Sequence, residues 1–595
     1  MFGLRKSLSG GKERAELAVK RILAATGEAN TLFNLAWSEQ AQGQTALALD
    51  HARQAVARLE TVRANLGSLT QNKQSFLAKY LGVFYYCLHL LLRQSTQAAT
   101  QEAFLLAQQT KARVLLDLLA GGKADFSRFL TDQDAFHLAQ LQQTAQHANA
   151  QLLQAQLHST DPQQIDPLRQ QLQQSEQALQ SFSDELLSRY PQLASRQPAK
   201  TLTLSQIAAL LPADTALLEY VILQAGTGKQ TLDETVLFCL TIQQGKPLLQ
   251  VYSIARTQKQ LAEQVSDFQA ACSNPNRDYQ LKAHDLYTLL LAPAEKQLAG
   301  KKRLLVCPDN VLWNLPFQAL LLPSSTSQGA TEREAFLWQR YQLSYAYSGS
   351  MLARILRDRS DPKRVRPPKT LLAFGNSDFG TLAQDAPSPP PDGRPLLADS
   401  RDLFQRGGIQ PLPNSQKEVE GIRNTFPEAT VYTGKQALKQ RALQEGGQYR
   451  ILHFATHGHY NDAAPLYSFV VLAEPPVNSS SDMFLTASDI FSQTWKADLV
   501  VLSACETGQG QKVNGEGIVG LTWALTGAGV QSAVVSQWSV SDASTSQLMQ
   551  GFNRNLKAGQ GKAEALQQAA LSLMKDGQHT HPYYWAAFIL VGDWQ

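Results

Sequence analysis

The sequence predicts an all-helical region followed by an α/β region built on a mostly parallel sheet. Three observations lead to this fold class. Residues 13–120 place apolar and alanine residues at helical spacing and contain no strong strand run. After Pro198, short apolar runs alternate with helical stretches, which is the pattern of βα units. Two apolar runs, at 450–459 and 497–508, end in small and polar residues, as buried parallel strands do where they open into loops.

Length and composition exclude several classes of protein. A chain of 595 residues suits roughly three to four domains. The formal net charge is only +4, and no basic stripe with interleaved aromatic residues is present, so we expect no direct nucleic-acid binding. Five cysteines without close pairing argue against a disulfide framework and a thiolate zinc site. We therefore expect a cytoplasmic protein with reduced thiols, no membrane segment and no metal or organic cofactor.

The first region, residues 1–120, has the spacing of tetratricopeptide (TPR) helix pairs. Small residues at this spacing let two helices cross closely, and a glycine permits the tight turn between them. The first pair is marked by Leu32, Leu35, Ala36, Gly43, Ala48, Ala52 and Ala55. A second pair is expected at 76–92 and 101–119, offset by 52 residues between Ala55 and Ala107 rather than by roughly 34. The array is therefore irregular, and a generic helical bundle is the alternative.

Residues 121–199 predict a helical hairpin that links the two regions. The Gly-rich segment 121–125 ends the preceding helix, and a glutamine-rich stretch follows at 127–190. Apolar positions alternate steps of four and three, as in a coiled-coil seam, at Leu168, Leu172, Ser175, Leu179, Phe182 and Leu186. Two prolines place the turn at 158–167. The hairpin serves either as a spacer or lever arm, or as a solvated arm without function.

The α/β region divides into residues 200–345 and 346–595. In the first part we expect strands at 217–223, 235–242 and 303–307 and helices at 258–272 and 278–298. In the second part we expect helices at 350–357, 416–426, 436–444, from about 517, at 544–555 and at 563–575, with strands at 370–375, 430–432, 531–538 and 585–591. The loops at 376–400 and 474–482 are the expected sites of proteolytic nicking.

The two apolar runs carry a histidine and a cysteine to the same predicted sheet edge. In open α/β sheets, chemistry collects at the carboxyl ends of the strands. His457 beside Cys505 would form a base and a nucleophile, because a histidine within hydrogen-bond reach can take the thiol proton. The backbone N–H groups of Gly458 and Cys505 could face one developing oxyanion. A buried structural cysteine at a strand end is the alternative.

The motifs around these residues resemble the CHAT family, caspase-like cysteine peptidases related to separase and often attached to TPR repeats. The resemblance is carried by His453-Phe-Ala-Thr-His-Gly458, Leu502-Ser-Ala-Cys-Glu-Thr-Gly508, Gly515-Glu-Gly-Ile-Val-Gly520, Ala528-Gly529 and Ser536-Gln-Trp-Ser-Val-Ser-Asp542. It implies Cys505 as nucleophile, His457 as general base and Gly458 in the oxyanion hole. It also implies an inactive caspase-like half-sheet, in 200–345, beside the active one in 346–595.

Other polar residues near these motifs have weaker assignments. Resemblance to separase places the substrate pocket near Trp538 and Asp542, and a carboxylate there would pair with an arginine or lysine of the substrate. Asp542 could equally cap a helix from Ser544, and Glu506 is a second candidate carboxylate. His453 is expected to be packed and hydrogen-bonded within its strand. A metal set of His453, His457, His459 and Asp462 lacks the spacing of zinc hydrolases.

The sequence thus predicts a cysteine endopeptidase that cleaves a cytosolic protein, after a basic residue, through the Cys505/His457 dyad. An activating protein partner is expected to bind the TPR-like region, and the resemblance suggests a bacterial defence or cell-death setting. One alternative is a catalytically silent TPR scaffold with a degenerate caspase-like domain. The other is a cysteine hydrolase or acyltransferase that acts on small molecules.

Overall fold

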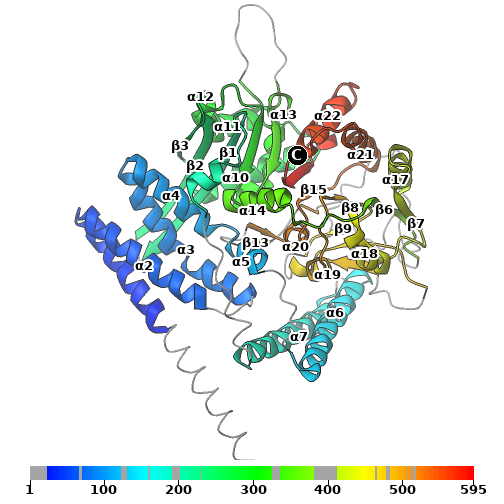
Figure 1. The fold of residues 1–595 in the computed structure, drawn as a ribbon, viewed down its shortest axis with the longest axis horizontal. Helices are drawn as coiled ribbons and strands as arrows, with labels where there is room; N and C mark the ends of the chain where they lie inside the picture. Colours follow the sequence, from blue (N-terminus) through cyan, green and yellow to red (C-terminus); the bar gives the residue numbers. More distant parts are fainter. Residues whose placement is uncertain are drawn as a thin grey trace, which may run out of the picture.

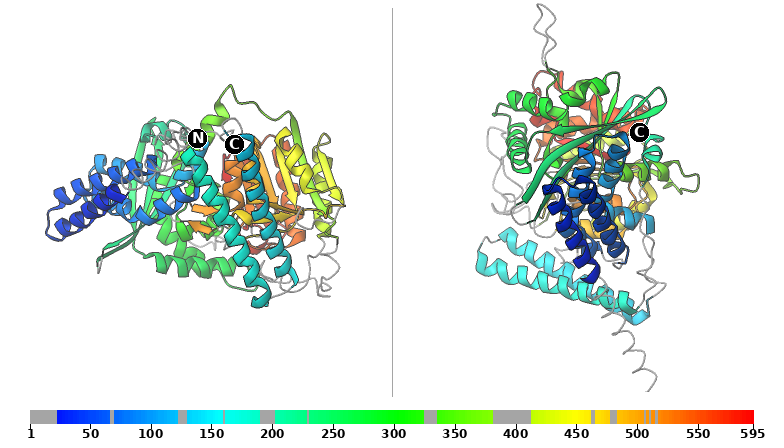
Figure 2. Two further views of the ribbon diagram at one scale, coloured as in Figure 1. Left: turned by 90° about the horizontal axis from the view of Figure 1, so that it is seen from below. Right: turned by 90° about the vertical axis from the view of Figure 1, so that its left-hand side faces the viewer.

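The helical N-terminal region packs against one half of a long β-sheet, and a separate helical hairpin packs against the other half (Figures 1 and 2). The computed structural model describes residues 23–65, 70–121, 130–158, 161–189, 202–227, 230–323, 335–380, 412–461, 465–476, 483–504, 507–508, 511–513 and 517–595. Most of the two loops in which we expect proteolytic nicking, namely 381–400 of 376–400 and 477–482 of 474–482, lies outside these residues. None of the helices described is long and apolar enough to cross a membrane.

The N-terminal region consists of helices that follow one another as hairpins. A helix over 23–41 is followed by α2 (Thr45–Asn65), α3 (Thr70–Arg93), α4 (Gln97–Thr110) and α5 (Arg113–Gly121). The expected turn at Gly43 is confirmed, and its φ of +77° is one that glycine adopts without strain. The single helix expected at 101–119 was wrong. It is interrupted at Lys111, whose backbone is extended, and at Ala112, whose φ is +50°.

The predicted helical hairpin is confirmed as α6 (Asp132–His158) and α7 (Pro162–Arg189). Its apolar seam buries Leu172 and packs, with Ala148, Leu152 and Ile165, against Tyr467 of the second half of the sheet region. The turn is shorter than expected, because α7 begins at Pro162 and Pro167 lies inside it. Proline at the first helical position loses no hydrogen bond, since that N–H has no partner within the helix.

The two half-sheets expected from the sequence are joined edge to edge into one 11-stranded sheet. Its strand order is β3-β2-β1-β4-β5-β16-β15-β12-β8-β6-β7. The first half contains β1 (Thr215–Thr227), β2 (Gln230–Gln243), β3 (Lys246–Ile254), β4 (Arg303–Cys307) and β5 (Gln342–Tyr345). The second contains β6 (Lys369–Ser377), β7 (Thr430–Gly434), β8 (Tyr449–Ala455), β12 (Leu499–Ser503), β15 (Ser532–Ser536) and β16 (Phe588–Gly592). Parallel pairing of β16 with β5 makes the junction.

The strands near the junction are apolar and buried on both faces. All residues of β12 and β15 are buried, as expected for parallel strands covered by helices. The covering helices include α10 (Gln258–Cys272), α14 (Gly349–Ser360), α17 (Pro413–Thr425), α20 (Leu521–Gly527), α21 (Asp542–Lys557) and α22 (Lys562–Met574). The mixed fold class predicted from the sequence is confirmed.

Some elements differ from their predicted extents. The helix expected at 278–298 is divided at Pro293 into α11 (Gln280–Leu290) and α12 (Glu295–Leu298), because proline cannot donate within a helix. The helix expected from about 517 begins only at Leu521, after β14 (Gly517–Val519). The sequence did not predict β3, β5 or the small sheet of β9 (Gly458–His459), β10 (Phe469–Val471) and β11 (Phe484–Thr486).

Candidate active site

The strands that lead to His457 and Cys505 are direct neighbours. β8 and β12 pair in parallel with Ala455 opposite Ser503, and the Thr456 N–H donates to the Ser503 carbonyl at 3.3 Å. The segments that follow both strands therefore leave the sheet at the same edge and at the same level. Cys505 and Glu506 themselves lie outside the described residues. The expected adjacency of the two strands is confirmed.

His457 is held by the small sheet that follows β8. Its carbonyl accepts a hydrogen bond of 2.9 Å from the Val471 N–H, and the next residue, Gly458, lies opposite Val470 in the β9–β10 pair. The imidazole is buried, with its ring centroid 5.4 Å from that of Phe379 in the segment after β6. Backbone and ring of His457 are thus fixed by two different segments, which limits the positions that the imidazole can take.

Ser536, at the end of β15, holds both sides of the segment that contains Cys505. Its hydroxyl donates to the Ala504 carbonyl, and its N–H donates to Thr507 Oγ1 at 3.2 Å. The Gly508 N–H donates to the Ser536 carbonyl at 2.7 Å. A Cβ on Gly508 would lie 2.9 Å from that carbonyl oxygen, so a glycine is needed here for close packing against β15. The residues that flank Cys505 are therefore fixed by the neighbouring strand.

His453 is buried and forms an ion pair or hydrogen bond with a carboxylate. Its Nε2 lies 2.6 Å from Oε1 of Glu418 on α17, and both side chains are almost fully buried. This confirms the expected packed, hydrogen-bonded histidine. His459 lies apart from it and packs its ring 5.2 Å from that of Phe469. Within the described part of the chain, no three His, Cys, Asp or Glu side chains are arranged to hold a metal ion; Asp462 falls outside that part.

Asp542 and Trp538 follow β15 at the same edge of the sheet. Oδ2 of Asp542 accepts two hydrogen bonds of 3.0 Å from Asn414, one from the backbone N–H and one from the side-chain amide. Asp542 thus caps the N-terminus of α17, where a carboxylate is favourable, whereas Ser541 is the N-cap of its own helix. Trp538 is 4% exposed, and its indole N–H donates to the Tyr583 carbonyl at 3.4 Å.

Several residues of this edge were not identified from the sequence. Phe379, Val471 and Glu418 come from segments whose patterns carry no chemical signal. Ser536 lies inside one of the motifs, but only the pairing of β15 with β12 shows that it binds the residues on either side of Cys505.

The other four cysteines are free thiols remote from this chemistry. Burial raises the pKa of Cys87 and of Cys239 to about 12, and it raises the pKa of Cys272 and Cys307 well above the ordinary value. Because the thiolate is the reactive form, these residues are poor nucleophiles at neutral pH.

Comparisons with known proteins place the C-terminal half of the chain in a family. The CHAT domain family matches residues 280–593. Tetratricopeptide repeat protein 28 of Homo sapiens is 24% identical over 344 residues, which cover 52% of this chain and 13% of that protein, and the Mus musculus protein matches equally. The chain thus spans about 13% of the length of these curated relatives.

Two solved structures align with the chain at low identity. The Arg-specific cysteine proteinase gingipain R is 10% identical, with a TM-score of 0.33, over 56% of this chain and 75% of that chain. The Saccharomyces cerevisiae separase–securin complex is 9% identical, with a TM-score of 0.40, over 98% of this chain and 48% of that chain.

Proposed function

The chain belongs to the CHAT domain family, and from this premise we propose that it is a cysteine endopeptidase that uses Cys505 as nucleophile and His457 as general base. The observation that carries the proposal is the pairing of β8 with β12, which brings the segments bearing these two residues to one edge of the sheet in register. The buried state of the other four thiols supports the choice of Cys505.

The proposed reaction proceeds in two steps. His457 takes the proton of the Cys505 thiol, and the thiolate attacks the carbonyl carbon of the substrate peptide bond. The negative charge on the oxygen is met by the N–H groups of Gly458 and Cys505. As the C–N bond breaks, the imidazolium returns the proton to the leaving amine. A water molecule, deprotonated by His457, then cleaves the thioester and releases a carboxylic acid and the thiol.

We propose cleavage after a basic residue, with Asp542 as the carboxylate that receives it. The two N–H groups of Asn414 bind Oδ2, which leaves Oδ1 as the acceptor that we assign to an arginine or lysine of the substrate. Glu506 is the second candidate for this role, and Trp538 would support the pocket from beneath as a buried residue. An activating protein is proposed to bind the TPR-like helices, because an unrestrained endopeptidase would damage its own cell.

Fluorogenic peptides with Arg, Lys, Asp or Leu before the cleavable bond test the activity. We expect Cys505→Ala and His457→Ala to lower kcat/KM by at least about 10³-fold, as loss of a nucleophile or its base does elsewhere. Cys272→Ala, at a buried thiol, is the matched control and should keep full activity. Asp542→Asn should retain the contact with Asn414 and lower the preference for Arg over Leu by about 10-fold or more.

A cysteine-directed covalent peptide probe separates a silent scaffold from a restrained enzyme. Labelling of Cys505 in the folded protein would support a competent nucleophile even if no peptide is cleaved. Absence of labelling, also after addition of candidate partner proteins, would instead favour the scaffold.

A further inference from the structure

The interruption between α4 and α5 places a lysine ammonium in the interior of the protein. Lys111 leaves the helix with φ −123° and ψ 128°, and its side chain is only 4% exposed. Nζ lies 2.8 Å from Oε1 of Glu219 and donates to the carbonyls of Tyr220 at 3.1 Å and Cys307 at 3.0 Å. The buried ammonium thus forms one ion pair and two hydrogen bonds. The helical region is thereby tied to the middle of β1 and to the end of β4.

The Glu219 carboxylate extends this connection to α14. Its Oε2 accepts hydrogen bonds of 2.9 Å from Gln108 Nε2 on α4 and from the Gly349 N–H at the start of α14. Gln108 Oε1 in turn accepts from the Ser350 N–H at 2.8 Å. Burial alone would lower the pKa of Lys111, but the Glu219 and Asp309 carboxylates raise it above its ordinary value, so the ammonium stays charged. The cluster is therefore a buried, charged link between the two regions.

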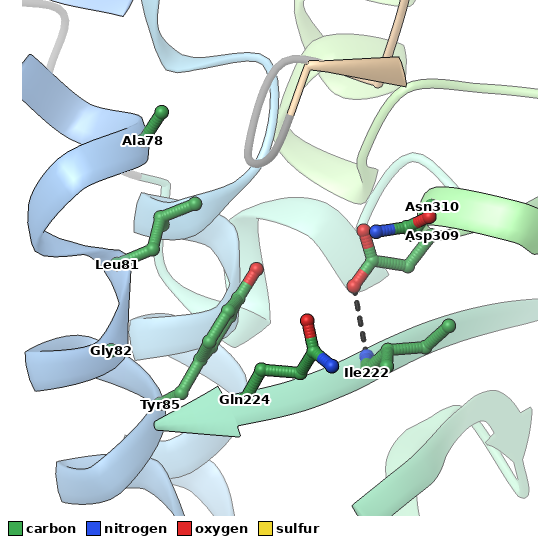
Figure 3. Close-up of a pocket in the computed structure, with 8 residues that line it drawn as sticks. All are labelled: Ala78, Leu81, Gly82, Tyr85, Ile222, Gln224, Asp309 and Asn310. Atoms are coloured by element: carbon green, nitrogen blue, oxygen red, sulfur yellow. Dashed lines mark hydrogen bonds between the residues drawn. The ribbon is translucent and has the colours of Figure 1, made fainter. Parts of the chain in front are cut away.

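From Cys307 the link continues into a short 3₁₀ helix, η3 (Asn310–Asn314). The preceding Asp309 is buried and accepts a hydrogen bond of 2.8 Å from the Ile222 N–H of β1. A cavity of about 60 Å³ separates this point from α3. Figure 3 shows Tyr85 and Leu81 of α3 on one side of the cavity, and Asp309 and Asn310 on the other. The helical region thus approaches the start of η3 from α3 as well as from Lys111.

The far end of η3 contacts the second half of the sheet next to the candidate nucleophile. The Trp313 carbonyl accepts a hydrogen bond of 2.9 Å from Gln537 Nε2. Gln537 directly follows Ser536, the residue that holds Ala504, Thr507 and Gly508 on either side of Cys505. η3 also contacts β13 (Gln511–Val513) and β14, the hairpin that follows the nucleophile in the sequence. Lys111 and the residues that flank Cys505 are thus connected through hydrogen bonds, packing contacts and a few covalent steps.

We propose that Lys111 is a positioning residue through which the helical region sets the position of the residues on either side of Cys505, namely Ala504, Thr507 and Gly508. Its consequence for catalysis rests on the proposed endopeptidase function, whereas the mechanical connection does not. A partner that binds the helices and shifts α4 would move the Lys111 ammonium together with Cys307, and η3 would pass the shift to Gln537 and Ser536. Binding of a partner at the helices would in this way change the position of residues in the half of the sheet that carries the candidate dyad.

Hydrogen-exchange mass spectrometry of the full chain tests the connection without requiring activity. The test variant is Lys111→Met with Glu219→Gln, which removes both charges of the ion pair, so that the Glu219 carboxylate is not left buried without its partner. The matched control is Lys562→Met with Asp593→Asn. This second buried pair, with an N–O distance of 3.0 Å, lies at the opposite end of β15, where the Ser532 hydroxyl donates to the Asp593 carbonyl. We expect the test variant to raise exchange in residues 507–508, β13 and β14 by about 3- to 30-fold relative to the control.

A third variant, Gln537→Met, breaks the connection where η3 meets the second half of the sheet. It keeps the proposal testable if the Lys111 variant does not fold. Gln537→Met alone should raise exchange in the same segments, and combining it with the Lys111 variant should add little, because both break one connection. Effects that multiply, or exchange that rises equally in the test and control variants, would overturn the proposal.

Labelling of Cys505 by the covalent probe then distinguishes the two proposals. If the wild-type protein is not labelled, either alone or with candidate partner proteins, but exchange changes locally as expected, the peptidase assignment fails and the connection stands. If the wild type is labelled and the Lys111 variant is labelled at the same rate as the Lys562 control, regulation through Lys111 is refuted while the peptidase stands.

Discussion

Removal of the Glu418 carboxylate should destabilise the strands beneath the candidate active site strongly. Glu418 Oε1 lies 2.6 Å from His453 Nε2, and both side chains are excluded from water. His453 Nδ1 has no hydrogen-bond partner within the described part of the chain, so Glu418→Ala would leave both ring nitrogens unsatisfied. Leaving a buried polar group without its partner costs about 1–3 kcal/mol, and about 3–5 kcal/mol where the broken pair is charged, so we expect a loss of about 1–5 kcal/mol for the opening of β8.

Native-state hydrogen exchange of peptides covering β8 and β12 measures this opening free energy directly. A loss of about 1–5 kcal/mol corresponds to exchange faster by roughly one to four orders of magnitude. Glu420→Ala, two residues further along α17 and exposed, is the matched control and should change exchange by less than about threefold. Glu418→Gln should recover part of the loss, because its amide oxygen can still accept from His453. Equal exchange in the Glu418→Ala and Glu420→Ala proteins would refute this reasoning.

Three further predictions concern other parts of the chain. Gly82→Ala should stabilise the protein by about 1 kcal/mol in urea unfolding, because Gly82 lies inside α3 and a Cβ there would meet Ala225 at 3.5 Å, an ordinary contact. Pro167→Ala should raise the free energy of opening of α7 by about 1–3 kcal/mol in hydrogen exchange, since the new N–H restores a helical hydrogen bond. Iodoacetamide at pH 8 should label only one of the five thiols of the folded chain, that of Cys505. The raised pKa values of Cys87, Cys239, Cys272 and Cys307 keep their thiolates about 10³-fold less populated than an ordinary thiolate. Labelling of any of these four at the rate of an ordinary thiol would contradict the prediction.

Local sequence patterns were enough to predict the elements that deliver the candidate dyad. β8 and β12 are short apolar runs that end in small polar residues, and this composition follows from burial on both faces of a parallel sheet. The helical hairpin was equally predictable, because its seam repeats along a single helix face. By contrast, the short strands β9 to β11 have two or three residues each, too few to show a period.

The partners of individual polar side chains depended on the tertiary structure. Lys111 stands in a stretch of helical composition, and the helix breaks there because acceptors on β1 and β4, more than 100 residues away in sequence, surround its ammonium. The sequence offered Asp542 as a cap for the helix that follows it, yet its carboxylate accepts hydrogen bonds from Asn414, 128 residues earlier in the chain. The sequence by itself therefore determined most of the longer strands and helices, and it indicated which segments carry a candidate nucleophile and base. Only the packing of distant segments decided which groups hold those residues, because hydrogen bonds and ion pairs across the sheet leave no periodic trace along the chain.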